Sequence, residues 1–579
     1  MKRYYTYLLC VVVFAICSCS GQKTDHVKLK IMGTSDVHGA LFPYDLVGER
    51  ATSSSLAQVY SYVDEERKKG DYEIILLDNG DILQGDPLVY YSNFEKTDTK
   101  HICAEIMNFM QYDAATVGNH DIEPGHEVYD KLVKEYQFPW MAANAVRNSD
   151  GNPYFEPYTV INKKGVKIVV LGLITPAIPK WLPEKIWSGM HFEPMLESAQ
   201  KWVKIIQEKE NPDFVIGLFH SGAGEEHGGD EANPENASLL VATSVSGIDM
   251  IICGHDHQEN IIWVENPDKE KVLVINPKSK AHFLAEVSVD FTWDQETETY
   301  KKTLNPKLIE VNKLPVSKEY TELFQPLFDE VDKYVSRPVG TFKTEISTKE
   351  AMFGDSPFID LIQNIQLDLA DADISFASPL SFNAIIDSGE LQVRDLFNLY
   401  RFENLLYTMN LTGKEIHGFL EFSYKDWFQQ MEKSSDPMLF IETTEKGSRL
   451  STMFFNYSSA EGIDYVVDLS KAYGERVSIL QMTNGDPFDE AKMYRVALNS
   501  YRGNGGGNHL TEGAGLTKEE LTSRLINSTT KDLRYYLMKW IEKKGTVDIQ
   551  CNQNWKVIPE DWHAEASKRE YELLYGLKD

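Results

Sequence analysis

The chain has 579 residues, a length that suggests two to four domains. Lys and Arg number 58 and Asp and Glu number 88, so the formal net charge is −30; the apolar share of 42% and the charged share of 25% are those of a globular protein. This composition excludes a disordered chain, a fibre and a polytopic membrane protein. The acidity also argues against a partner that is a nucleic-acid polymer, because proteins that bind such polymers neutralise phosphates with Lys and Arg. An acidic protein that binds a phosphate compound needs a local source of positive charge.

The first 18 residues are typical of an export signal. Lys2 and Arg3 precede an apolar run, residues 8–17, that is too short to span a bilayer. Residues 16–19 resemble a bacterial lipobox, which implies cleavage before Cys19 and attachment of a lipid to it. We expect an exported monomer, lipid-anchored through Cys19 in the periplasm or at the outer membrane or cell surface. An ordinary signal peptide with incidental cysteines is the alternative.

Three cysteines lie beyond the expected lipid site, namely Cys103, Cys253 and Cys551. None of them belongs to a CxxC pair. Export would permit one disulfide, but an odd number excludes a framework in which every cysteine is paired. Buried free thiols are the preferred interpretation.

Residues 27–275 alternate short apolar runs with polar or helical stretches, which is typical of a layered α/β fold. The runs predict six strands, at residues 27–32, 74–77, 114–117, 166–174, 214–219 and 250–253. Between the first two runs, Leu56, Val59 and Val63 share one face of a predicted helix that ends at Gly70. A second amphipathic helix is predicted over residues 318–335, where it would connect two parts of the chain.

Polar motifs follow five of the predicted strands, where an α/β sheet places its sites. They contain Asp36 and His38, Asp78 and Asp81, Asn119, His120 and Asp121, His220, and His255 and His257. One such Asp would usually be a turn residue or helix cap, and one such His a structural histidine. Five motifs together supply only oxygen and nitrogen ligands, which suits divalent Zn, Mn, Fe or Co. No cysteine joins the set, so a Cys-rich structural zinc site is excluded.

The ordered motifs D-x-H, GD, GNH[DE], H-S-G and GH-x-H resemble those of the calcineurin-like metallophosphoesterase superfamily. Over roughly residues 27–545 the layout resembles the secreted 5′-nucleotidase family, which includes the 2′,3′-cyclic-nucleotide 2′-phosphodiesterases. The resemblance implies an α/β fold with an N-terminal four-layer metallophosphoesterase sandwich joined by a helix to an α/β 5′-nucleotidase C-terminal domain. The expected boundaries are a lipoprotein signal peptide at 1–18, the phosphoesterase domain at 19–312, the connecting helix at 313–340, the substrate-binding domain at 341–545 and a tail at 546–579.

Position by position, the resemblance implies a centre of two divalent metal ions. One ion would be held by Asp36, His38 and His257, the other by Asn119, His220 and His255, and Asp81 would bridge them. Such a pair clamps the oxygens of a phosphoryl displacement and generates hydroxide near neutral pH. The expected reaction is attack of metal-bound hydroxide on the phosphorus of a phosphate ester, without a covalent enzyme intermediate. The two ions would also supply the positive charge that this acidic chain otherwise lacks.

His120 resembles the family's catalytic histidine, which stabilises charge on the phosphoryl oxygens or the leaving group. The family usually orients that histidine with an Asp or Asn three residues later. Here Glu123, with a longer side chain, takes that position. Asp121 is an alternative partner, or a helix N-cap residue.

The part of the chain after Gly340 is expected to select the substrate. The resemblance implies that two aromatic side chains sandwich a base, and Tyr501 matches one of them. Phe455 is the preferred match for the other, with Tyr457 close enough in sequence to be confused with it. Core aromatic residues are the alternative interpretation. Arg502, beside Tyr501 in a glycine-rich loop, and Asn404 complete the candidate substrate-binding residues.

One segment favours a branch of the family. Typical 5′-nucleotidases carry an N-G-G-x-R stretch where this chain has Ser378-Pro379-Leu380-Ser381-Phe382, without Arg. That segment is more similar to the cyclic phosphodiesterase and 3′-nucleotidase branch. We therefore expect 2′,3′-cyclic nucleotides and 3′-nucleotides as substrates. The alternatives are a 5′-nucleotidase, UDP-sugar hydrolase or thiosulfohydrolase on the same scaffold, and a lipoprotein that binds nucleotides without turning them over.

Overall fold

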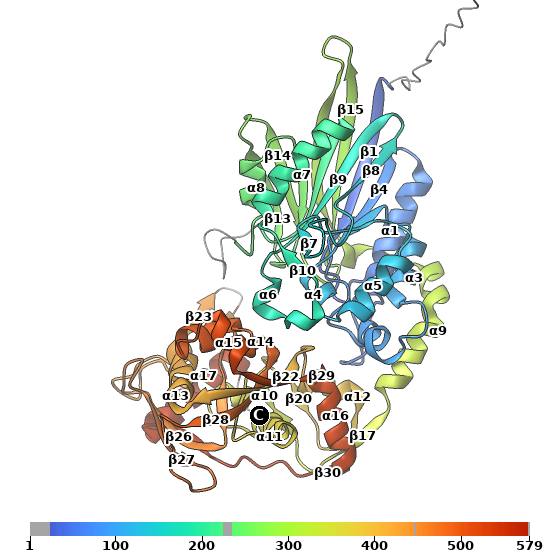
Figure 1. Cartoon of the computed structure of the whole chain (residues 1–579). Helices are drawn as coiled ribbons and strands as arrows, with labels where there is room; N and C mark the ends of the chain where they lie inside the picture. The colour runs from blue at the N-terminus through green and yellow to red at the C-terminus, as the bar shows by residue number, and fades with distance from the viewer. Residues whose placement is uncertain (1–23, 224–233, 445–446, 577–579) are drawn as a thin grey trace, which may run out of the picture.

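The computed structural model describes residues 24–223, 234–444 and 447–576 (Figure 1). The expected signal peptide and the lipid site at Cys19 lie outside the described residues. Within the described ranges, none of the helices combines the length and the apolar character needed to cross a membrane. The chain folds into an N-terminal part and a C-terminal part that are joined by one long helix (Figure 1).

Two six-stranded sheets form the centre of the N-terminal part. The first sheet has the order β16-β15-β1-β4-β5-β6. Its strands β1 (His26–Thr34), β4 (Glu73–Asp78), β5 (Ala114–Thr116) and β6 (Trp140–Met141) are parallel. The strand β15 (Phe283–Asp294) pairs antiparallel with β1, and β16 (Thr299–Glu310) pairs antiparallel with β15. The second sheet has the order β13-β14-β12-β11-β9-β8. Its strands β9 (Val166–Ile174), β11 (Phe214–His220), β12 (Met250–Cys253) and β14 (Lys271–Pro277) are parallel. The edge strands β8 (Tyr158–Lys163) and β13 (Glu259–Glu265) pair antiparallel with β9 and β14. All six strands predicted from the sequence are present.

The two sheets pack face to face, with helices on their outer faces. Leu29 and Ile31 of β1 belong to the same buried cluster as Ile168 and Val170 of β9, which places this cluster between the sheets. A separate cluster buries α1 (Leu56–Lys69) and α3 (Ile102–Met110) against the first sheet, and another buries α7 (Met195–Glu210) and α8 (Ser238–Ser244) against the second. Because both faces of each sheet are covered, the central strands are apolar runs rather than alternating ones. The expected four-layer sandwich is confirmed.

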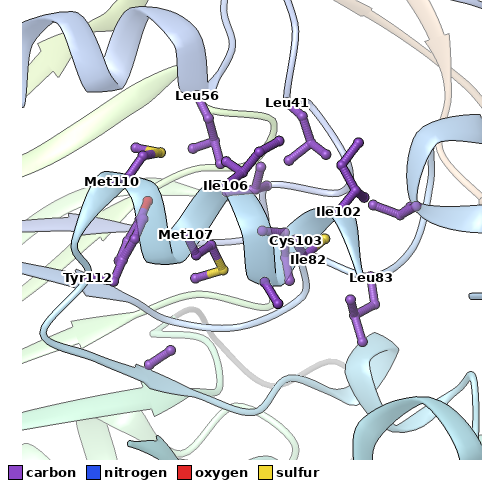
Figure 2. Packing of buried hydrophobic residues seen from close by; sticks show 14 of the residues in the cluster. Leu41, Leu56, Ile82, Leu83, Ile102, Cys103, Ile106, Met107, Met110 and Tyr112 are labelled. Carbon is purple, nitrogen blue, oxygen red and sulfur yellow. The ribbon is translucent and has the colours of Figure 1, made fainter. Parts of the chain in front are cut away.

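The helix layer over the first sheet is closely packed. Figure 2 shows Ile102, Ile106 and Met110 of α3 beside Leu41 and Leu56. The helix α1 ends before Gly70, as predicted, and the φ of 70° at Gly70 closes the helix in the left-handed conformation.

The connecting helix α9 (Lys318–Val335) agrees with its prediction and continues through Pro326. It runs along the edge of the N-terminal part and leads into the C-terminal part (Figure 1). Tyr320 and Phe324 are buried, and the Tyr320 hydroxyl donates a hydrogen bond to the carbonyl of Leu41 at 2.9 Å. The first half of α9 is therefore fixed to the N-terminal part.

The C-terminal part is built on a five-stranded sheet of order β25-β19-β28-β22-β29. The strands are β19 (Ile374–Ala377), β22 (Leu405–Thr412), β25 (Ser459–Glu461), β28 (Met493–Asn499) and β29 (Leu525–Asp532). The helix α11 (Pro357–Ala370) begins after the N-cap Ser356, whose side chain accepts the backbone amide of Ile359. The helix α13 (Gly413–Lys425) also packs on this sheet, where Phe419 stacks on Phe376 at 3.9 Å between ring centroids.

Residues 546–576 differ from the prediction that they form a tail. The strand β30 (Thr546–Val547) pairs with β17 (Pro338–Phe342), and β31 (Trp555–Ile558) pairs with β26 (Ile463–Asp468). Trp555 stacks on Tyr465 with ring centroids 5.4 Å apart, and α17 (Glu560–Tyr575) buries Ala566 in the same cluster. The apolar side chains of this segment thus complete the C-terminal core.

Candidate metal centre and adjoining cavity

The five polar motifs meet at one end of the sandwich. Strands β1, β4 and β5 of one sheet and β11 and β12 of the other deliver them at their carboxyl ends. Backbone hydrogen bonds tie the motifs together, since the amide of Asp36 donates to the carbonyl of Gly80 and that of His38 to the carbonyl of Asp81. Positive φ values, which are uncommon outside glycine, occur at Asp36, His38, Asp81, His255 and His257. Such strained positions cluster at functional sites.

The first predicted ligand group, Asp36, His38 and His257, has its donor atoms within 4.8 Å of one another. The Nε2 atoms of His38 and His257 are 3.0 Å apart, and Nε2 of His257 lies 3.3 Å from Oδ1 of Asp36. The Asp36 carboxylate also accepts the backbone amide of His255 at 3.0 and 3.1 Å. The structure therefore brings together the group that the sequence assigned to one ion.

The second group surrounds the buried ring of His220. Its Nδ1 lies 2.7 Å from the carbonyl oxygen of Asn79, so Nδ1 must carry the proton. The opposite nitrogen, Nε2, lies 3.0 Å from Oδ2 of Asp81 and 3.0 Å from Oδ1 of Asn119. A carbonyl partner on one ring nitrogen is the usual way in which a metal-binding histidine is oriented.

The donor atoms of Asp81, His220 and His255 lie within 4.8 Å of one another. A proton or a cation must separate Nε2 of His220 from the Asp81 carboxylate. Burial alone would lower the pKa of His220, but Asp81 and Asp36 raise it to about 10, so a proton fills this place when no metal ion is bound. The donor set therefore fits a divalent ion held by Asp81, Asn119, His220 and His255.

Gly118 shows how closely the motifs approach. A Cβ atom at this position would overlap Oδ1 of Asp81. The same carboxylate oxygen accepts the backbone amide of His120 at 2.7 Å. Any side chain at Gly118 would therefore displace the carboxylate that the sequence assigned to both ions.

The predicted catalytic histidine has Glu123 as its partner. Nδ1 of His120 lies 2.7 Å from Oε2 of Glu123. Burial opposes protonation of His120, but the carboxylates of Asp81 and Glu123 outweigh it and raise its pKa to about 9. Asp121 is not the partner of His120. Its carboxylate accepts the backbone amides of Asp81, Ile82, Leu83 and Gly118, and the bond from Gly118, the N-cap residue of the helix that follows, is the helix-capping role considered for it. Asp121 holds two of the motifs in register.

Two residues near His255 were not identified from the sequence. Nε2 of His255 lies 2.7 Å from Oε1 of Glu235, which leaves Nδ1 as the atom that can bind an ion. The ring of Trp181, in α6 (Ile178–Trp181), lies 5.6 Å from the His255 ring. Trp181 lies in the segment that follows the end of β9. The rule that sites lie at the ends of strands could therefore have identified it from the sequence. Glu235 lies in a stretch without periodicity.

A cavity of about 690 Å³ extends from this centre to the C-terminal part. The N-terminal part contributes Asn119, His120, Glu123, Trp181, Glu235 and His255 to its lining. The short helices α4 (Asn119–Ile122) and α6 lie at the end of the N-terminal part that faces the other part (Figure 1). The side chain of Asn504 donates a hydrogen bond to the carbonyl of Trp181 at 3.2 Å, which joins the two walls.

The C-terminal wall contains three of the predicted substrate-binding residues, Phe455, Tyr501 and Asn404. Phe455 and Tyr501 are both partly exposed, as residues that contact a ligand must be. Tyr457, the alternative to Phe455, is instead buried, and its ring is parallel to that of Trp427 at 4.5 Å. The structure thus separates the two aromatic candidates: Tyr457 is a core residue and Phe455 faces the cavity.

Arg502 differs from the expectation that it contacts substrate. Its side chain is buried, and its guanidinium group donates to the carbonyls of Phe455 at 2.5 Å and Gly506 at 3.1 Å. Burial lowers its pKa to about 10, which still leaves it charged near neutral pH. Gly507, with a φ of 69°, packs where a Cβ atom would overlap Nη1 of Arg502. Arg502 and the glycines therefore hold the Phe455 segment and the Tyr501 loop together.

Comparison with protein families matches both parts of the chain. Residues 29–259 match the family described as calcineurin-like phosphoesterase. Residues 338–512 match the family described as 5′-nucleotidase, C-terminal domain. The two matches lie on either side of α9.

Similar proteins include the trifunctional nucleotide phosphoesterase protein YfkN of Bacillus subtilis, 26% identical over 92% of this chain; this chain spans 39% of that relative's length. A 2′,3′-cyclic-nucleotide 2′-phosphodiesterase/3′-nucleotidase of Haemophilus influenzae is 25% identical, with 92% of this chain and 88% of the relative covered. The crystal structure of a 5′-nucleotidase precursor from Thermus thermophilus matches with a TM-score of 0.61 at 22% identity, over 92% of this chain and 100% of that one. This last similarity concerns the fold.

Proposed function

Since the chain belongs to the calcineurin-like phosphoesterases in its N-terminal part and to the 5′-nucleotidase family in its C-terminal part, we propose that this hydrolase acts on 2′,3′-cyclic nucleotides and 3′-nucleotides with two divalent metal ions. The observation that carries the proposal is the shared cavity. Its wall on one side bears Asn119, His120 and His255 of the metal centre, and its wall on the other bears Phe455 and Tyr501. A phosphate ester and its attached base can thus be bound at the same time.

In this proposal Asp36, His38 and His257 hold one ion, Asn119, His220 and His255 hold the other, and Asp81 contacts both. Asp81 is suited to that position because its charge acts on His220 and also on His38. When bound, the two ions would neutralise charge on the phosphoryl oxygens and activate a water molecule for the displacement. Their identity among Zn, Mn, Co and Fe is left open by this donor set.

His120 is proposed as the catalytic residue that does not hold an ion. Its backbone amide is fixed by Asp81 and its ring by Glu123, so the Nε2 edge is held at the metal side of the cavity. From there Nε2–H can donate to a phosphoryl oxygen or to the leaving oxygen as negative charge develops. Glu123 is a positioning residue, because it acts through the His120 ring.

The base is proposed to lie between Phe455 and Tyr501. Stacking on aromatic rings contributes roughly 1–3 kcal/mol per base and tolerates different bases. Asn404 lines the same wall and offers an amide for a hydrogen bond with the sugar or base. The preference for the 2′,3′-cyclic branch comes from the segment at residues 378–382, which lacks the arginine of typical 5′-nucleotidases.

A comparison of substrates tests the proposal. The mature chain, loaded with Mn²⁺ or Co²⁺, is incubated with 2′,3′-cyclic AMP, 3′-AMP, 5′-AMP, UDP-glucose and an aryl phosphate, and phosphate and nucleoside are measured. We expect 2′,3′-cyclic AMP and 3′-AMP to be hydrolysed most efficiently. Rapid hydrolysis of 5′-AMP with inert 2′,3′-cyclic AMP would contradict the choice of branch and favour a 5′-nucleotidase or UDP-sugar hydrolase.

We also propose that the mature chain begins at the lipid-modified Cys19 and lies outside the cytoplasm as a monomer. The positive residues and apolar run before Cys19 support this proposal. Fractionation of cells that produce the whole chain tests it. We expect the protein in the membrane fraction, and Cys19→Ala should abolish lipid labelling at this site. Recovery of unmodified wild-type protein from the cytoplasm would contradict it.

A further inference from the structure

A second group of potential metal ligands lies in the C-terminal part, away from the cavity described above. Asp355 precedes α11, Asp360 lies in the first turn of α11, and Cys551 lies between β30 and β31. One donor atom of each, a carboxylate oxygen or the thiol sulfur, lies within 4.8 Å of the other two. Segments separated by almost two hundred residues in the sequence thus converge on one point.

Two oxygens in this group are buried and have no partner outside it. Asp360 is 1% exposed, and neither its Oδ1 atom nor the Oδ2 atom of Asp355 accepts a hydrogen bond from a described residue beyond the group, in which the two carboxyl groups and the Cys551 thiol contact one another. The other oxygens are occupied, since Oδ2 of Asp360 accepts the amide of Asn552 at 3.0 Å and Oδ1 of Asp355 accepts the amide of Ser356 at 3.0 Å. These bonds fix the two carboxylates, and one oxygen of each is left for a ligand.

The surroundings add negative charge rather than neutralising it. Glu461 is 3% exposed, and its carboxylate accepts the side-chain amide of Asn552 at 2.8 Å, so that Asn552 links it to Asp360. In the part of the chain that the structure describes, no Lys or Arg forms an ion pair with Asp355, Asp360 or Glu461. Buried carboxylates without a counter-charge are unfavourable unless a cation or a proton joins them.

We infer that Asp355, Asp360 and Cys551 bind a divalent ion of the zinc class, separate from the phosphoesterase centre. Carboxylate oxygens together with a thiolate suit Zn²⁺, whereas Ca²⁺ and Mg²⁺ prefer oxygen alone. Donor atoms around a tetrahedral zinc ion lie roughly 3–4 Å apart. The three donor atoms here lie within 4.8 Å of one another, so small movements of the side chains would bring them to these distances. The fourth ligand is water from a cavity of about 810 Å³ that is lined by Asp355, Cys551 and His563.

Such an ion would have a structural role. It would join the start of α11 to the segment between β30 and β31, and so fix residues 546–558 to the C-terminal core. Cys551 forms no disulfide with the other described cysteines, so its thiol is available for this bond. Binding that requires the folded arrangement of these segments stabilises the folded state.

Metal content measured on the full mature chain tests this inference. After saturation with Zn²⁺ and removal of loosely bound ions, the wild type should retain three ions per chain, whereas Asp360→Asn and Cys551→Ser should each retain two. Asp368→Asn is the matched control, because Asp368 is an exposed aspartate on the same helix α11. Hydrolysis of an aryl phosphate should be unchanged in all three variants, which shows that each is folded.

A spectrum identifies the site. Co²⁺ bound by a thiolate gives a near-ultraviolet charge-transfer band, and the phosphoesterase centre has no cysteine ligand. We expect this band in the wild type and in Asp368→Asn, and its loss in Cys551→Ser. Two ions per chain and no sulfur band in the wild type would overturn the inference in favour of a proton shared by the two aspartates. Three ions in every variant would also overturn it. If a variant does not fold, the wild-type cobalt spectrum still decides.

Discussion

His120 and Glu123 form a hydrogen-bonded pair, with 2.7 Å between Nδ1 of the histidine and Oε2 of the glutamate. The side chain of Glu is one methylene longer than the Asp or Asn typical of the family at this position, and the contact is still made. His120 directly follows the proposed ligand Asn119, and both residues of the pair line the shared cavity. The geometry of the pair leaves Nε2 as the ring atom available to substrate.

His120→Ala should lower kcat by roughly 10²–10³-fold, the loss typical when one donor to a developing negative charge is removed. Bound metal should remain at the wild-type amount, because His120 holds no ion in the proposed centre. Steady-state kinetics with 3′-AMP and metal analysis of the same preparation check both statements. Near-normal turnover in His120→Ala would exclude the proposed role.

Glu123→Gln should have a smaller effect than His120→Ala. The amide can still hold the imidazole ring but cannot balance a positive charge on it. We therefore expect Glu123→Gln to have a reduced kcat and little change in KM. Its kcat should remain higher than that of Glu123→Ala. Equal losses in the Gln and Ala variants would show that the carboxylate charge, rather than orientation, is what His120 requires.

Asp81→Asn should reduce the amount of bound metal and abolish turnover. The carboxylate contacts His220 and is fixed by the amide of His120, so its loss removes a ligand and an anchor together. Metal analysis after dialysis measures the first effect. Asp121→Asn serves as the comparison, because Asp121 supports backbone amides rather than an ion. Full metal retention in Asp81→Asn would contradict the proposed bridging position.

Glu403 gives a pH-dependent prediction for the interface between the two parts. Glu403 is 8% exposed. Its burial, and then the nearby charge of Glu123, raise its pKa well above the ordinary 4.5. Asp532 also raises this pKa, whereas Arg534 and His120 lower it. The folded protein therefore retains a proton that the unfolded chain has released, and this contribution to stability falls as pH rises above about 4.5.

Glu403→Gln should remove that contribution and flatten the fall of Tm as pH rises above about 4.5. Exposed Glu390→Gln is the matched control in the same part of the chain and should follow the wild type. Thermal unfolding at several pH values provides the measurement. A Glu403→Gln curve parallel to that of the wild type would show that this carboxyl group does not titrate differently on folding.

Much of the metal centre could be predicted from the sequence, because short apolar runs place the residues that follow them at the same edge of a sheet. Asp36, Asp81 and His220 were found in this way. Glu235 was not found, because no local pattern records its contact with His255. Glu403 was not found either, because its electrostatic interaction with Glu123 joins segments that are far apart in the sequence. Arg502 was predicted to bind substrate because a charged residue in a glycine-rich loop resembles a ligand-binding residue. In the structure its guanidinium group instead donates hydrogen bonds to backbone carbonyl groups.

The segment at residues 546–576 shows a second limit of local patterns. Its two strands are short, and each pairs with a strand far away in the sequence. The apolar residues of these two strands become part of a core only because the strands pair with distant partners. The same long-range pairing brings Cys551 beside Asp360, a proximity that sequence spacing does not reveal.

The central claim is that the metal centre and the aromatic wall act on one bound nucleotide. It is tested most directly by kcat/KM of Tyr501→Ala on 3′-AMP and on an aryl phosphate, measured with one metal-loaded preparation. Removal of the stacking ring should lower kcat/KM for 3′-AMP by roughly 5- to 150-fold, which corresponds to about 1–3 kcal/mol. The value for the aryl phosphate should stay close to that of the wild type. Equal losses on both substrates, or no loss on either, would contradict the claim.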